Sequence, residues 1–222
     1  LMLDIKTVDI PSAFTAFNTV RLLVPVAELA RGNVSTTLSL TTFLDRHMNP
    51  LLNSLLGSGR LMSNSVEINN SETFEKISTI LKNDKFKVLS LNDLDFDFEV
   101  RNGRVYLKPF DIKIGQHKLN IQGDQGVDRT MNYTMLMNIP KSELGSGVGS
   151  ALDELTSMAS QQGLSLDFGE SVDVGFLVTG TFLDPQVKPV FGKGVGAITE
   201  QVKEQVKEQV EEKVEQVKQE VR

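Results

Sequence analysis

Residues 94–107 read LDFDFEVRNGRVYL, and this stretch decides the fold. Its first half alternates apolar and acidic residues, the pattern of an antiparallel strand with one buried and one solvated face. Asn102-Gly103 then predicts a type I′ hairpin turn, because both central positions of that turn require a positive φ. The two-residue loop fixes a register that brings apolar residues together, pairing Val100 with Val105 and Phe98 with Leu107.

The alternation continues beyond this hairpin as far as residue 139. Phe110 faces inward like Leu107 although the spacing between them is odd, so we expect a β-bulge near Pro109 to absorb the extra residue. Gly115-Gln116 predicts a second tight turn, and a further alternating strand completes a four-stranded antiparallel meander with one apolar face. The second turn pairs Ile112 with Leu119 and Phe110 with Ile121.

Periodicity predicts the elements on either side of this meander. β-branched and alternating stretches predict strands over residues 1–10, 33–43, 60–68 and 172–182, the last ending at Asp184-Pro185. Apolar residues at helical spacing predict amphipathic helices over 12–24, 71–83 and 141–161, with Ser12 and Ser71 as N-caps of the first two. A short apolar turn or helix at 51–56 ends in Gly57-Ser58-Gly59.

These elements predict an α+β protein, with a curved, mostly antiparallel sheet whose apolar face is covered or capped by helices. We expect residues 1–190 to form the β-rich domain, and from the abrupt strand-like start at Leu1 we expect the chain to be a fragment of a longer protein. We expect residues 191–222 to form a separate tail, a long amphipathic helix with a valine stripe and a net acidic polar face. Anionic lipid would bind such a helix weakly, so we expect docking on the domain or helix–helix self-association through residues 198–222.

Composition excludes several classes of protein. The net charge of −6 argues against a nucleic-acid partner. With no Cys and only His47 and His117, both expected at turns or on the surface, almost nothing remains for thiolate or imidazole chemistry. The acidic residues at 93, 95, 97 and 99 share one strand face, which we interpret as solvated because no calcium-loop spacing accompanies them. We therefore expect no enzyme activity, no catalytic residue, no metal and no cofactor.

The remaining candidate site is the apolar face of the sheet. One interpretation is an ordinary core covered by the predicted helices, and the pattern alone favours it because exposed apolar faces are uncommon in monomers. The other is an incompletely covered groove that accepts acyl chains, with methionines as adaptable lining. The candidate groove residues are Phe96, Phe98, Val100, Leu107, Ile112, Met131, Met135, Met137 and Phe176.

Several segments together resemble the C-terminal region of AsmA-family proteins, in the arrangement found in Bacteroides-type bacteria. The resemblance covers residues 33–190, and the order and spacing of the segments carry it. The segments are residues 48–50, 55–61, 91–100, Asn102-Gly103, 109–112, Gly115, 121–123, 131–140 and 179–187. The valine-rich tail departs from the family pattern.

The resemblance implies an envelope protein of a Gram-negative cell that serves outer-membrane biogenesis without catalysis. It implies a periplasmic location, with attachment to the inner membrane through an N-terminal anchor upstream of this chain. The partners would be phospholipid or fatty-acyl chains conducted along an apolar β-groove between the two membranes, and the groove interpretation then overtakes the closed core. The alternative is a structural or assembly module of the outer membrane, with a closed core and protein partners.

Overall fold

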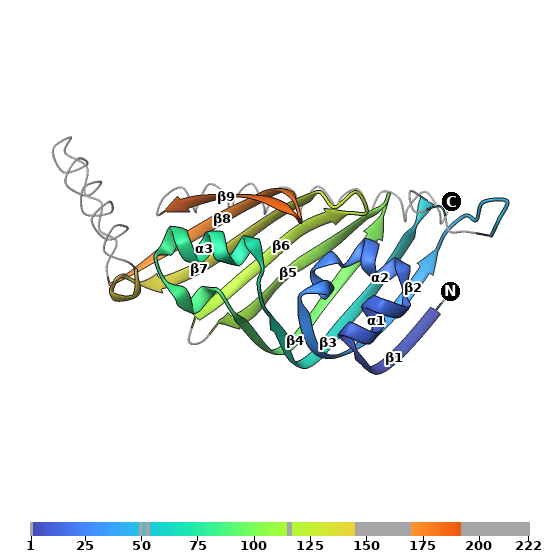
Figure 1. Ribbon diagram of the computed structural model, residues 1–222, viewed down its shortest axis with the longest axis horizontal. Helices are drawn as coiled ribbons and strands as arrows, with labels where there is room; N and C mark the ends of the chain where they lie inside the picture. The colour runs from blue at the N-terminus through green and yellow to red at the C-terminus, as the bar shows by residue number, and fades with distance from the viewer. Residues whose placement is uncertain (1, 49–50, 52–53, 115–116, 145–169, 192–222) are drawn as a thin grey trace, which may run out of the picture.

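The computed structural model describes residues 2–48, 51, 54–114, 117–144 and 170–191, which form one nine-stranded antiparallel sheet. Strand order follows chain order, so every strand pairs with its neighbours in the sequence (Figure 1). The strands are β1 Met2–Asp9, β2 Ala30–Thr41, β3 Leu56–Ile68, β4 Leu89–Arg101, β5 Arg104–Ile114, β6 His117–Gly126, β7 Met131–Pro140, β8 Ser171–Thr181 and β9 Asp184–Phe191.

The predicted α+β class is wrong, because the described residues are 61% strand and only 22% helical. The helices are short inserts between consecutive strands of the meander, not a layer of their own. They are α1 Ile10–Ala16, α2 Asn18–Leu23, η1 Pro25–Glu28, α3 Glu72–Leu81, η3 Asp84–Phe86 and η4 Lys141–Glu143. The predicted helix over 141–161 begins as η4, and its remainder beyond residue 144, like the tail over 191–222, lies outside the described residues apart from Phe191 in β9.

Three local predictions fail at backbone level. Gly57-Ser58-Gly59, expected to end a turn or helix, lie within β3 and pair with β4. The helix predicted over 12–24 begins earlier, capped by the Asp9 carboxylate, which accepts a hydrogen bond from the Ser12 N–H at 2.9 Å. It is interrupted at Phe17, whose extended backbone (φ −116°, ψ 111°) separates α1 from α2. The chain also continues past Asp184 into β9, which the sequence pattern missed because Pro185 and Pro189 resemble strand terminators. An edge strand tolerates both prolines, since it needs hydrogen bonds on one side only.

The central meander is confirmed in register. Asn102 and Gly103 both have positive φ, 50° and 71°, as a type I′ turn requires. The register of β5 shifts between Leu107 and Phe110, where the bulge is expected. The cross-strand pairs are also those predicted, Val100 with Val105, Phe98 with Leu107, Phe110 with Ile121 and Ile112 with Leu119.

Replacing Gly103 with alanine should lower the free energy of unfolding by about 1–2 kcal/mol, because a Cβ opposes the left-handed conformation. Asn102→Asp is the matched control, since aspartate tolerates this conformation and should change stability by less than about 0.5 kcal/mol. Urea titration of both variants measures the difference. Equal stability of the two variants would contradict this role of the turn.

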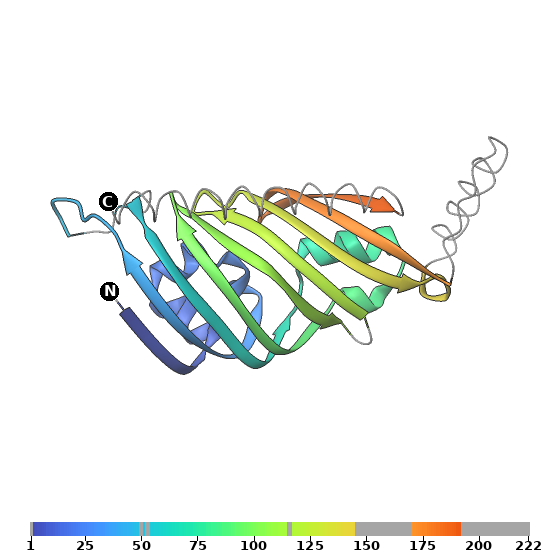
Figure 2. The ribbon, with the colours of Figure 1, turned by 180° about the vertical axis from the view of Figure 1, so that it is seen from behind.

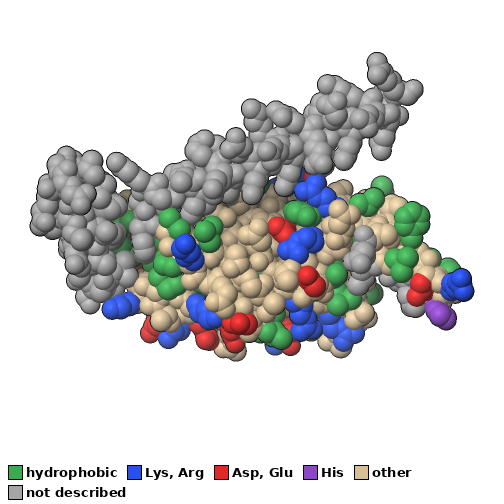
Figure 3. Space-filling model, turned by 90° about the horizontal axis from the view of Figure 1, so that it is seen from above, with side chains coloured by type: hydrophobic (Ala, Val, Ile, Leu, Met, Phe, Trp, Pro, Cys, Tyr) green, Lys and Arg blue, Asp and Glu red, His purple; other side chains and the backbone are tan. Residues whose placement is uncertain are grey.

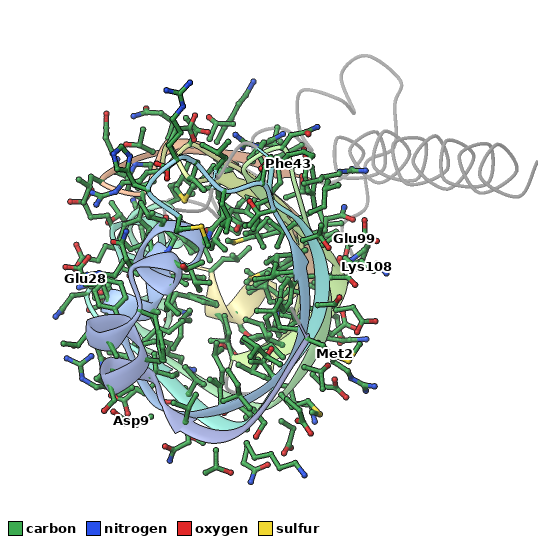
Figure 4. All side chains as sticks on the ribbon, turned by 90° about the vertical axis from the view of Figure 1, so that its right-hand side faces the viewer. Met2, Asp9, Glu28, Phe43, Glu99 and Lys108 are labelled. Carbon is green, nitrogen blue, oxygen red and sulfur yellow. The ribbon has the colours of Figure 1, made fainter. Side chains whose placement is uncertain are left out.

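The sheet bends along a line of irregular residues that crosses several strands. Thr7 in β1 and Asp93 in β4 have positive φ, 53° and 54°, and Gly32 stands beside a register shift in β2. At these points the side chains that face inward change from odd-numbered to even-numbered positions or the reverse. In β4, for example, Leu91 and Leu94 are both buried although they lie three residues apart. Bulges increase local twist and bend. The sheet therefore curls around its apolar face, as the view along the molecule shows (Figure 4).

The helices pack on this inner, concave face at two separate places (Figures 1 and 2). The segment from α1 to η1 connects β1 to β2 and lies over the first strands of the sheet. Helix α3 connects β3 to β4 and lies against the opposite end, where the Lys76 ammonium donates to the Pro185 carbonyl of β9 at 2.6 Å. Its buried residues Phe74, Ile77 and Leu81 join the main apolar core beneath it.

Candidate functional site

All nine candidate groove residues lie on the inner face, but the structure divides them into two groups. Six are between 0 and 8% exposed and therefore belong to the packed core, namely Val100, Ile112, Met131, Met135, Met137 and Phe176. The other three, Phe96, Phe98 and Leu107, are half-buried. Only this second group keeps an accessible part of its side chains, although Phe98 and Leu107 also pack against the buried cluster that contains Val100.

The half-buried group continues across the sheet into strands β1 to β3. Cα partners place Leu3 opposite Leu38, and Thr36 opposite both Ile5 and Leu61, so these side chains share the face of Phe96 and Phe98. We call the half-buried apolar residues of this region the inner strip. It comprises Leu3, Ile5, Leu38, Leu61, Phe96, Phe98, Leu107 and Phe110.

The aromatic rings of the inner strip lie close against the sheet. A Cβ atom on Gly59 would lie 2.5 Å from the ring of Phe98, so this glycine makes room for the ring on the neighbouring strand. The Phe96 and Phe110 rings stack with centroids 4.4 Å apart, beside the bulge of β5. Stacked aromatic side chains stabilise each other beyond their buried area. Packing therefore holds the three phenylalanine rings of the inner strip in place.

Two linked hydrogen bonds, which we call the polar latch, join the α2 segment to strands β6 and β7 on the inner face. The Gln125 side chain, 6% exposed, donates to the backbone carbonyl of Leu23, which lies 102 residues away in the sequence. The Tyr133 hydroxyl donates in turn to the Gln125 side-chain oxygen at 3.0 Å, and burial raises the pKa of Tyr133. Leu23 also joins a small apolar cluster with Val100 and Val105. These contacts hold the end of α2 against the inner face next to the inner strip.

A polar cavity of about 540 Å³ lies at the bend line of the sheet. Thr7, Arg31 and Glu67 are among its lining residues, together with backbone and hydroxyl groups of β2 and β3. The Ser63 hydroxyl there donates to the Asn33 carbonyl at 2.6 Å, so part of its polar lining is already hydrogen-bonded. Among the described residues no group of three or more His, Asp and Glu side chains gathers to hold a metal ion.

Two carboxylates of the acidic row of β4 pair with cations on the outer face. Asp95 accepts two hydrogen bonds from the Arg60 guanidinium at 2.6 and 2.5 Å, which hold the pKa of this carboxyl below its usual range. Glu99 lies 3.5 Å from the Lys108 ammonium. Asp95, with 47% of its side chain exposed, fits the interpretation of a solvated outer face, whereas the Glu99 side chain is only 17% exposed.

The two histidines differ in their surroundings. His47 is exposed, as expected. His117 is 9% exposed and lies 3.1 Å from the Glu143 carboxylate, so the expectation of a turn or surface position is wrong for it. Hydrogen bonds from His117 and from Lys85 lower the pKa of Glu143. This polar cluster joins the segment after α3 to the end of β7 and has the character of a structural contact.

No described helix is long and apolar enough to cross a membrane. No protein-family model, no curated protein and no solved structure matches this chain.

Proposed function

We propose that this chain is a non-catalytic envelope protein that binds lipid acyl chains along the inner strip. The observation that carries the proposal is a continuous set of half-buried apolar side chains across five strands of one concave face. Burial of acyl methylenes on such a surface contributes about 0.8 kcal/mol per CH₂, so several groups in contact suffice for retention. No proton transfer or covalent step is required.

The sequence resemblance supplies the cellular setting of the proposal. An AsmA-like protein would stand in the periplasm of a Gram-negative cell, tethered to the inner membrane by a segment upstream of this chain. Its inner strip would carry phospholipid or fatty-acyl chains between the inner and outer membranes.

A structural or assembly role is the second candidate function, and one observation favours it. Six of the nine candidate groove residues are buried in the core, as expected of a closed domain that binds other proteins with its outer surface. The two functions differ in whether the half-buried strip holds lipid.

Native mass spectrometry of the purified chain, with organic extraction of bound molecules, separates these functions. Consecutive residues of β3 provide a matched pair of variants, because Leu61 faces inward while Met62, 38% exposed, faces the other side. Leu61→Asn should lower retained lipid about tenfold, and Met62→Asn should leave it unchanged. A clean ligand-free mass for the parent chain, with no uptake of added fluorescent lipid, would favour the structural role.

A further inference from the structure

The connection between β2 and β3 carries the most exposed cluster of large apolar side chains in the described structure. Phe43 is 74% exposed and Met48 73%, and Leu44 and Leu51 are each close to half exposed. The described part of this connection projects beyond the end of the sheet, and hydrophobic side chains gather on this end beside a few charged and His side chains (Figures 1 and 3). Exposed apolar clusters of this kind mark interaction sites.

One more exposed apolar residue, at the start of β3, lies at the same end of the sheet. Leu56 is 53% exposed and pairs with Thr41. We call this set the apolar tip, comprising Phe43, Leu44, Met48, Leu51 and Leu56.

Local hydrogen bonds hold the apolar tip in shape. The Leu51 N–H donates to the Phe43 carbonyl at 2.8 Å, and the Ser54 hydroxyl donates to the Leu51 carbonyl at 2.7 Å. The His47 N–H donates to the Asp45 carboxylate at 2.8 Å. These bonds satisfy backbone groups within the connection itself, which lowers the cost of moving it into an apolar phase.

We propose that the apolar tip inserts into the interfacial region of a phospholipid bilayer. The tip projects from the molecule, whereas stable protein–protein interfaces need an extended complementary surface of about 800 Å² per partner. Arg46 and His47 are exposed within the tip and can remain at the level of the lipid headgroups while the apolar side chains enter the acyl boundary. This binding does not depend on the inner strip, so it extends the proposed function without resting on it.

A tryptophan reporter tests the insertion directly, because the chain contains no Trp. Phe43→Trp places the only indole on the tip, and Val88→Trp places it at a 48% exposed position between η3 and β4 as the control. On addition of vesicles of phosphatidylcholine and phosphatidylglycerol, the Phe43→Trp emission should shift to the blue and be quenched by brominated phosphatidylcholine. The Val88→Trp emission should not change.

The double variant Met48→Ser/Leu51→Ser should lower partition onto these vesicles by about tenfold or more, since both side chains lose their apolar burial. Its circular dichroism should match that of the parent chain, because both positions are exposed. Leu61→Asn should bind vesicles normally, so loss of lipid retention and loss of vesicle binding report on different surfaces.

Three results would overturn the proposal. One is the absence of a blue shift with Phe43→Trp, and another is an equal shift with Val88→Trp. The third is a concentration-dependent shift without vesicles, accompanied by dimerisation in analytical ultracentrifugation, because the tip would then bind a second copy of the chain.

Discussion

Phe176→Ala should lower the free energy of unfolding by about 3–5 kcal/mol, the largest stability loss expected for any of the candidate groove residues. The Phe176 side chain is 0% exposed and lies in β8 between Met135 and Pro189 on the neighbouring strands. Truncation would leave a cavity in the main core that the curved sheet cannot close without moving several strands. Urea denaturation followed by circular dichroism measures the loss.

The same truncation at Phe98 should cost about half as much or less, because that ring is only half-buried on the inner strip. Phe98→Ala should instead reduce the lipid that the chain retains, measured by the extraction used for Leu61→Asn. A Phe98→Ala variant as unstable as Phe176→Ala would mean that the strip is part of a closed core, and the structural role would then be favoured.

Gln125→Ala should lower the free energy of unfolding by about 2–4 kcal/mol, because it leaves the Leu23 carbonyl and the Tyr133 hydroxyl without this buried partner. It should also release the α2 segment from the inner face. Trypsin should then cut more rapidly after the exposed Arg21 within α2, since local opening exposes the backbone to the protease.

Asn132→Ala is the control for this experiment, because Asn132 is an exposed amide on the neighbouring strand β7. It should change neither the urea midpoint nor the rate of cleavage after Arg21. If Gln125→Ala also leaves both unchanged, the latch does not fasten α2 to the sheet.

The features that the sequence predicts well are local. The Asn102-Gly103 turn requires its own backbone conformation, and its two-residue loop leaves one register for Val100 and Val105. The parity change before Phe110 likewise requires a bulge somewhere near Pro109. Each of these constraints acts within a few residues, so no knowledge of the distant chain is needed.

The features that the sequence misses depend on distant contacts. The helical spacing of residues 12–24 gives no sign of the break at Phe17. Nor does it indicate that the Leu23 carbonyl accepts a hydrogen bond from Gln125, 102 residues away. Which inner-face residues stay half-buried depends on where that segment lies. Alternation therefore identified the inner face, but it could not separate Phe98 on the strip from Phe176 in the core. Cross-strand register could have drawn attention to Leu38 and Leu61, which align with Phe98 and Phe96.

The strictly sequential strand order has a consequence for how this architecture can evolve. Each strand exchanges hydrogen bonds only with its predecessor and successor in the chain. Duplication of a hairpin would therefore add two strands to the sheet without rethreading any connection. Such duplications would lengthen the inner face while the sequence of each turn continued to determine its own backbone conformation. Proteins with sheets of different lengths could therefore descend from one short ancestor.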